Sequence, residues 1–227
     1  MNLYTQLGNS IDGGNGNMEF EEEINIKENL DVPADARLPT KYGEFRIRVF
    51  HEEETGLDHV ALTLGKMDGP DPVLIRVHSE CITGDAFSSV RCDCGSQLDD
   101  TLKKIQEKGW GCLLYLRQEG RGIGLHAKIQ AYNLQDKGAD TLDANLMLGL
   151  PADARDYSIA SIILGNIGIK RVSLLTNNPD KVEKLEELGI EVVERVPLIV
   201  GVRIENRDYL HTKSEKMGHH ISSSDLE

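Results

Sequence analysis

The sequence lacks any run of apolar residues long enough to cross a bilayer, which takes about 20 residues in a helix. The N-terminus also lacks a basic segment followed by an apolar core, the pattern of a secretory signal peptide. Both absences argue against a membrane-inserted or exported protein. We therefore expect a soluble, cytoplasmic one.

Positive charge is scarce. The 227 residues include 25 Lys and Arg against 38 Asp and Glu, a net charge of −13. This balance disfavours broad binding to nucleic acid or to an anionic membrane surface, so we expect neither as a partner. A polyanionic small molecule would need a local basic pocket.

Cysteine is too sparse for a disulfide framework, which is dense and typical of small secreted domains. Four cysteines are present, and Cys81, Cys92 and Cys94 fall within fourteen residues of one another. Metal binding or catalysis is the better interpretation of such a cluster.

The N-terminal segment is poor in aromatic residues and rich in Asn, Gly and Glu. Residues 1–36 hold eight acidic residues and a single basic one, Lys27. Such a composition cannot bury enough apolar surface to offset the entropy of ordering. We interpret 1–36 as a disordered acidic extension, 37–217 as one folded domain and 218–227 as a flexible tail.

The rest of the chain alternates predicted strands and helices. A helix containing Leu98, Leu102 and Ile105 is expected to end at Gly109, and a second is expected to follow Asn178 and Pro179. The predicted strands are 45–50, 59–64, 73–78, 112–116, 174–175 and 192–193. This order predicts an α/β fold with a mixed β-sheet flanked by helices.

The three clustered cysteines have the spacing C-x10-C-x-C. Three thiolates can hold a tetrahedral zinc ion and leave its fourth position open, as hydrolysis requires. A structural zinc site with His78 as the fourth ligand, or free thiols, are the alternatives. Cys112 lies inside an apolar strand and is assigned to the core.

Residues 78–80 (His-Ser-Glu) also match the first half of the zinc deaminase signature, H-x-E. The second half, P-C-x-x-C, is missing from the chain. A nucleotide deaminase is therefore an alternative to the hydrolase.

Three further segments carry charged or glycine-rich patterns. Residues 117–124 follow a buried strand with three glycines and two arginines, which suits phosphate binding but also a flexible connection. Residues 176–181 could meet an anion at a helix N-terminus, although a turn and a helix cap explain them equally well. The charges of 153–156 are explained by an ordinary solvated helix start.

Taken together, four segments resemble GTP cyclohydrolase II: 76–81 (RVHSEC), 91–95 (RCDCG), 117–121 (RQEGR) and 175–179 (LTNNP). The resemblance extends from about Leu38 to Met217 and implies that 37–217 form the catalytic domain. It implies a homodimer with a zinc ion in each subunit and Mg²⁺ on the phosphates of its substrate, GTP.

The resemblance also implies the reaction. The imidazole ring of GTP is opened with release of formate and pyrophosphate, giving 2,5-diamino-6-ribosylamino-4(3H)-pyrimidinone 5′-phosphate. This is the first committed step of riboflavin biosynthesis.

Carried over residue by residue, the resemblance makes Cys81, Cys92 and Cys94 zinc ligands, Asp153 the general base and Arg155 a nucleophile. Tyr132 corresponds to a tyrosine near the imidazole ring. The implied GTP contacts are Arg76, Val77, His78, Ser79, Glu80, Gln97, Glu119, Gly120, Arg121, Thr141, Thr176 and Lys181. A guanidinium is almost always protonated and nucleophilically poor, so Arg155 as a transition-state stabiliser is the alternative.

Three other functions stay open on the sequence alone. A deaminase would release ammonia without formate, and a regulatory protein with a closed zinc site would bind GTP without turnover. A cyclohydrolase that stops early would retain the formyl group or omit pyrophosphate release.

Overall fold

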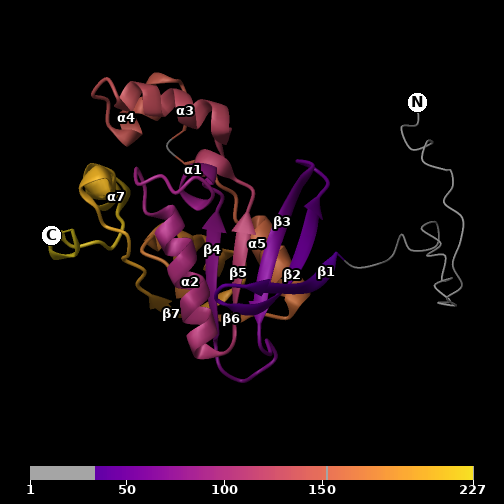
Figure 1. The fold of residues 1–227 in the computed structure, drawn as a ribbon. Helices are drawn as coiled ribbons and strands as arrows, with labels where there is room; N and C mark the ends of the chain where they lie inside the picture. Colours follow the sequence, from indigo (N-terminus) through magenta and orange to yellow (C-terminus); the bar gives the residue numbers. More distant parts are fainter. Residues whose placement is uncertain (1–33, 152, 227) are drawn as a thin grey trace, which may run out of the picture. The chain divides into compact units, whose positions relative to one another are not determined.

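The computed structural model describes residues 34–151 and 153–226. Within this part, seven strands form one sheet in the order β1-β2-β3-β5-β4-β6-β7 (Figure 1). The strands are β1 Asp35–Thr40, β2 Gly43–Glu52, β3 Leu57–Leu64, β4 Val73–Ser79, β5 Gly111–Leu116, β6 Arg171–Leu175 and β7 Glu191–Val196. The pairs β1–β2, β2–β3 and β3–β5 are antiparallel, whereas β4–β5, β4–β6 and β6–β7 are parallel. The mixed sheet predicted from the sequence is confirmed.

The two helices predicted from the sequence are present as α2 Cys94–Lys108 and α6 Pro179–Glu187, and the described residues form five further α-helices. The five are α1 Ile82–Asp85, α3 Gly124–Gln135, α4 Thr141–Met147, α5 Ser158–Ile167 and α7 Arg207–Met217. Short 3-10 helices cover η1 Glu119–Gly122, η2 Ile204–Asn206 and η3 Ser223–Asp225. Gly109 ends α2 with a left-handed φ of 81°, and the Asn178 side chain caps α6 by accepting from the backbone N–H of Asp180.

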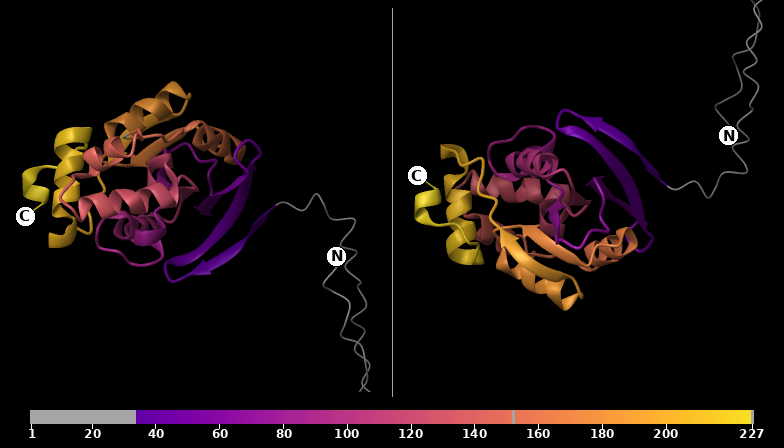
Figure 2. Two further views of the ribbon diagram at one scale, coloured as in Figure 1. Left: turned by 90° about the horizontal axis from the view of Figure 1, so that it is seen from above. Right: turned by 90° about the horizontal axis from the view of Figure 1, so that it is seen from below.

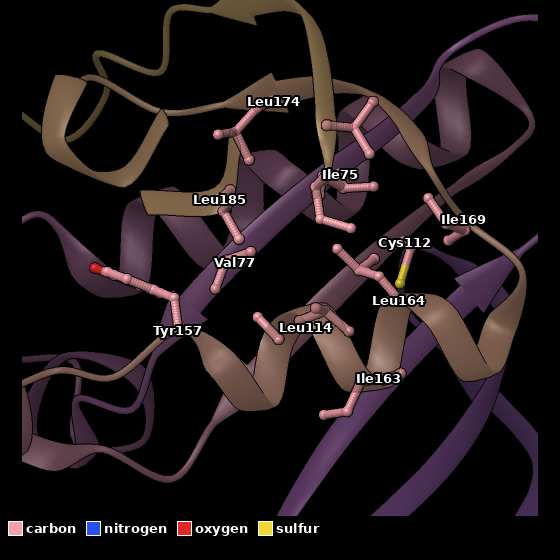
Figure 3. Close-up of a cluster of buried hydrophobic side chains, with 14 of the residues drawn as sticks. Ile75, Val77, Cys112, Leu114, Tyr157, Ile163, Leu164, Ile169, Leu174 and Leu185 are labelled. Atoms are coloured by element: carbon pink, nitrogen blue, oxygen red, sulfur yellow. The ribbon is translucent and has the colours of Figure 1, made fainter. Parts of the chain in front are cut away.

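Both faces of the central strands are covered. Neighbouring residues of a strand point to opposite faces, and Leu74 therefore packs with α2 whereas Ile75 packs with α5 and α6. The larger cluster joins Val77 and Leu114 to the α5 and α6 side chains Ile163 and Leu185 (Figure 3). Burial on both faces explains why β5 and the first three residues of β4 are continuous apolar runs.

The connections that follow β4 and β5 cover opposite faces of the sheet. The first runs from β4 through α2 to β5, and the second runs from β5 through α3, α4 and α5 to β6, on the far side of β4. Connections that diverge in this way leave a crevice at the carboxyl ends of parallel strands. Helices α1, α3 and α4 lie beyond that end of β4 and β5 (Figure 1).

Both predicted domain limits differ from the structure. Asp35 and Ala36, assigned to the extension, belong to β1, where Asp35 pairs with Arg46 at 2.6 Å. Residues 1–33 of the predicted extension lie outside the described residues. In the predicted tail, Ile221 and Leu226 are buried against Leu210 of α7.

None of the helices in the described ranges combines the length and the apolar character that crossing a membrane requires.

Two adjacent residues of α5 test the packing. Ile163 is 0% exposed in the larger core cluster, and Ile162 is 58% exposed. We expect Ile163→Ala to lower the free energy of unfolding by about 2–5 kcal/mol, because it leaves a cavity. Ile162→Ala should change it by no more than about 0.5 kcal/mol. Urea denaturation measures both, and equal losses would contradict this orientation of α5.

Candidate functional site

A cleft opens at the carboxyl ends of β4, β5 and β6. It encloses about 1040 Å³ of empty space including its mouth, which is the size of a small-molecule site. Its walls come from the end of β4, the start of α2, η1, α3, the segment before α6, and α7. Segments distant in the sequence therefore meet at the crevice of the sheet.

The three predicted cysteines meet in this cleft. Cys81 precedes α1, Cys92 lies in the following turn, and Cys94 is the first residue of α2. Their Sγ atoms all lie within 4.8 Å of one another. A Cβ atom on Gly84 would lie only 2.9 Å from the Sγ of Cys92, so glycine leaves the thiols the space they occupy.

Hydrogen bonding among the thiols separates their acidities. It lowers the pKa of Cys81, and it raises the pKa of Cys92 to about 11 and that of Cys94 well above its usual range. Three adjacent thiolates repel one another, so deprotonating one thiol opposes the deprotonation of the other two. A divalent cation would relieve that repulsion, and three sulfur ligands with an open fourth position suit zinc.

His78 is not placed as a fourth metal ligand beside the three cysteines. Its Nε2 lies 3.1 Å from both carboxylate oxygens of Asp85, and its ring stacks on Tyr115 with centroids 5.5 Å apart. Among the described residues, the group of possible ligands contains only the three cysteines. The geometry therefore favours a three-thiolate site over the four-ligand alternative.

Lys128 of α3 lies beside the cluster, although sequence reasoning did not select it. Its Nζ donates to Cys81 Sγ at 3.2 Å, Thr83 Oγ1 at 3.0 Å and Glu119 Oε1 at 2.8 Å. Glu119 also accepts from the backbone N–H of Ile82 at 2.7 Å. The sequence could have indicated Lys128, because it precedes Tyr132 by four residues and therefore lies on the same face of the helix.

Three cations of the cleft have no carboxylate partner within the described part of the chain. Arg76 donates to the carbonyl of Leu175 at 2.8 Å and to Gln97, and Lys181 donates to the carbonyl of Val77 at 2.6 Å. Arg121 forms no ion pair there, and its backbone has a left-handed φ of 60°. Burial lowers the pKa of Arg76 and of Lys181. An anionic ligand would supply the missing counter-charge.

Arg155 and Asp153 form a close, partly buried ion pair. Arg155 Nε lies 2.9 and 3.1 Å from the two carboxylate oxygens, and the Arg155 backbone N–H donates to the same carboxylate at 3.0 Å. Burial opposes both charges, but these contacts outweigh it, so the pKa of Arg155 is raised and that of Asp153 is lowered. Both groups are therefore held in their charged forms.

Most of the predicted site residues line the one cleft. They are Arg76, His78, Ser79, Glu80, Cys81, Cys92, Cys94, Gln97, Glu119, Gly120, Arg121, Tyr132, Arg155, Thr176 and Lys181. Val77 points into the core instead, and Asp153 contacts Arg155 from outside the lining. The side chain of Thr141 lies outside the described residues.

Other residues of the lining were missed. Besides Lys128 they include Gln135, Asn145, Asn177, Asn178, Tyr209, Lys213 and His219. The solvated helix start expected at 153–156 is also wrong, because α5 begins only at Ser158 and Arg155 lines the cleft.

Comparison with known proteins gives consistent matches. The sequence pattern of the family described as GTP cyclohydrolase II matches residues 31–197. GTP cyclohydrolase-2 of Acinetobacter baumannii (strain SDF) is 58% identical over 198 residues, covering 87% of this chain and 99% of that protein. GTP cyclohydrolase-2 of Neisseria meningitidis serogroup B is 54% identical over 197 residues, covering 87% and 100%. A solved two-domain 3,4-dihydroxy-2-butanone 4-phosphate synthase from A. baumannii covers 63% of this chain and 32% of its own, with 16% identity and a TM-score of 0.35.

The family pattern covers most of the chain and includes the cysteines, the cations of β4 and η1, and the Asp153–Arg155 pair. The chain belongs to the GTP cyclohydrolase II family of enzymes.

Proposed function

We propose that this enzyme hydrolyses GTP for riboflavin biosynthesis, opening the imidazole ring and releasing formate and pyrophosphate. One observation carries the proposal: a three-thiol cluster and buried, unpaired cations share a single cleft. The first feature suits hydrolysis at a ring carbon, and the second suits a triphosphate. Relatives named GTP cyclohydrolase-2 at 54–58% identity support the same substrate.

Cys81, Cys92 and Cys94 would hold a zinc ion. When bound, zinc acts as a Lewis acid that lowers the pKa of water and so permits hydrolysis at neutral pH. Lys128 donates to the Sγ of Cys81 and adds positive charge beside the thiolates. Glu119 keeps Lys128 in place and connects it to the backbone of Ile82, the first residue of α1.

The guanine base would lie near the cysteines. Arg76 Nε, His78 Nδ1 and Ser79 Oγ are buried without a partner in the described chain, and their residues line the cleft. A purine edge presents hydrogen-bond donors and acceptors that would pair with them. Tyr132, whose ring lies 4.5 Å from the guanidinium of Arg91, supplies an aromatic surface nearby.

The triphosphate would lie along the cations. Arg121 offers a forked donor and Lys181 a compact positive charge, both suited to phosphate oxygens. Mg²⁺ with GTP stays part of the proposal, because that ion is held largely by substrate phosphates and water. The homodimer and the cytoplasmic location stay predictions as well.

We assign Arg155 to electrostatic stabilisation of the phosphoryl group. A nucleophilic guanidinium must lose a proton, and Asp153 holds Arg155 in the charged form. The lowered pKa of Asp153 also makes it a weak general base. In this assignment, Asp153 orients the guanidinium, and Arg155 neutralises charge as pyrophosphate leaves.

The products test the proposal. Purified protein incubated with GTP and Mg²⁺ should release formate and pyrophosphate in equal amounts with the pyrimidine phosphate. Ammonia without formate would identify a deaminase, and binding without turnover would identify a regulatory protein. A formylated product, or one that keeps its triphosphate, would identify a cyclohydrolase that stops early. Chromatography with a formate assay distinguishes all four outcomes.

Replacing one cysteine tests the metal. Cys92→Ser should lose bound zinc, measured by elemental analysis, together with formate release, because one sulfur ligand is removed. Cys112→Ala is the control, since Cys112 is buried in β5 away from the cluster. That variant should keep its zinc. Formate production by zinc-free Cys92→Ser protein would contradict the metal-dependent hydrolysis.

Arg155 variants test its role. Arg155→Ala should lower the rate of pyrophosphate release by about 10²–10³-fold, as loss of one transition-state donor does, and Arg155→Lys should keep part of that rate. Arg37→Lys is the control, because Arg37 is an exposed residue of β1 that is distant from Arg155 in the sequence. A phosphorus-labelled Arg155 adduct trapped during turnover would instead establish covalent catalysis.

A further inference from the structure

Helix α7 lies beyond the matched family pattern, which ends at residue 197, yet it forms part of the cleft. Tyr209 and Lys213 of α7 line the cleft, and His219 follows just after the helix. Helix α7 packs against α4, and the two views from above and below show it beside the α3–α4 region (Figure 2). The C-terminal segment therefore belongs to the site physically.

Lys213 connects α7 to the cysteine turn. Its Nζ lies 2.7 Å from Oδ1 of Asp93, the residue between Cys92 and Cys94. Lys213 is 8% exposed and Asp93 is 3% exposed. A buried ion pair is costly to break, because either partner left alone is a desolvated, uncompensated charge.

The same carboxylate connects the cysteine turn to β4. Oδ2 of Asp93 accepts from Nε2 of Gln97 at 2.6 Å, and the side-chain Oε1 of Gln97 accepts from Arg76. Arg76 in turn donates to the carbonyl of Leu175 at the end of β6. A continuous buried network thus runs from α7 through Asp93 of the Cys92–Cys94 turn to the central strands.

We propose that Lys213 is a positioning residue that acts through Asp93 to hold the Cys92–Cys94 turn, so that α7 determines how tightly the cysteines retain zinc. The inference rests on the zinc site of the proposed function. Without the ammonium, the buried Asp93 carboxylate loses its counter-charge between Cys92 and Cys94, and hydrating it requires the turn to move. Movement of the turn displaces two of the three metal ligands.

Lys216 offers a matched control on the same helix. It is one turn further along α7, its side chain is 44% exposed, and it pairs with Asp140 at the start of α4. Lys216→Met removes a charge and an ion pair from α7 without touching the cysteine turn. It therefore separates the proposed role of Lys213 from general stabilisation by the helix.

The test measures zinc release from full-length, zinc-loaded protein to a chromogenic chelator in the absence of GTP. Lys213→Met should release zinc about 10–100-fold faster than wild type, the usual effect of losing a group that orients metal ligands. Lys216→Met should release it at the wild-type rate. Lys213→Arg, which keeps the positive charge, should restore most of the retention.

Asp93→Asn provides a second route if Lys213→Met does not fold. It should also release zinc faster, and adding Lys213→Met to it should cause little further change, because the lysine acts through that carboxylate. Wild-type release rates in Lys213→Met or in Asp93→Asn would overturn the inference, as would equal acceleration in Lys216→Met. A wild-type protein that binds no zinc would overturn the proposed metal site itself.

Discussion

The parallel pairing of β4 with both β5 and β6 is the constraint on which the site depends. It brings the carboxyl ends of three strands to one edge, and the connections that leave β4 and β5 diverge there to opposite faces. Cys81 follows β4, Glu119 follows β5, and Thr176 follows β6, so each strand delivers a residue to the same cleft. The apolar packing on both faces keeps these strand ends fixed while the loops beyond them carry the chemistry.

The cleft contains unpaired positive charges, although the chain as a whole is negatively charged. The protein carries a net −13, yet Arg76, Arg121 and Lys181 enter the cleft without carboxylate partners among the described residues. Burying Arg76 and Lys181 without a carboxylate partner destabilises the folded protein, and their contacts with backbone carbonyls offset only part of that cost. A triphosphate would complete the compensation, so substrate binding and stability are coupled in this arrangement.

Local patterns explain what the sequence predicted well. The strands, the end of α2 at Gly109, the cap at Asn178 and the clustering of the cysteines all depend on residues close together in the chain. Lys213 was missed because its partner Asp93 lies 120 residues away, and only the fold brings them together. Asp153 and Arg155 resembled a solvated helix start for the same reason, since the other residues of the cleft that Arg155 lines come from distant parts of the chain. Likewise, the apolar residues of the C-terminal segment are too isolated to form a periodic pattern, although two of them bury against α7.

The loop that forms η1 joins the two chemistries that the proposed reaction requires. On one side, Glu119 binds Lys128 and the backbone of Ile82, beside the proposed metal ligands. On the other side, the carbonyl of Arg121 accepts from the N–H of Ala154, between Asp153 and Arg155. Gly122 approaches this segment so closely that a Cβ atom would lie 2.8 Å from the carbonyl oxygen of Ala154, and its φ of 88° independently favours glycine. A shift of this loop would therefore move the cysteines and the Asp153–Arg155 pair together, and in the proposed reaction this link would keep ring opening and pyrophosphate release in register.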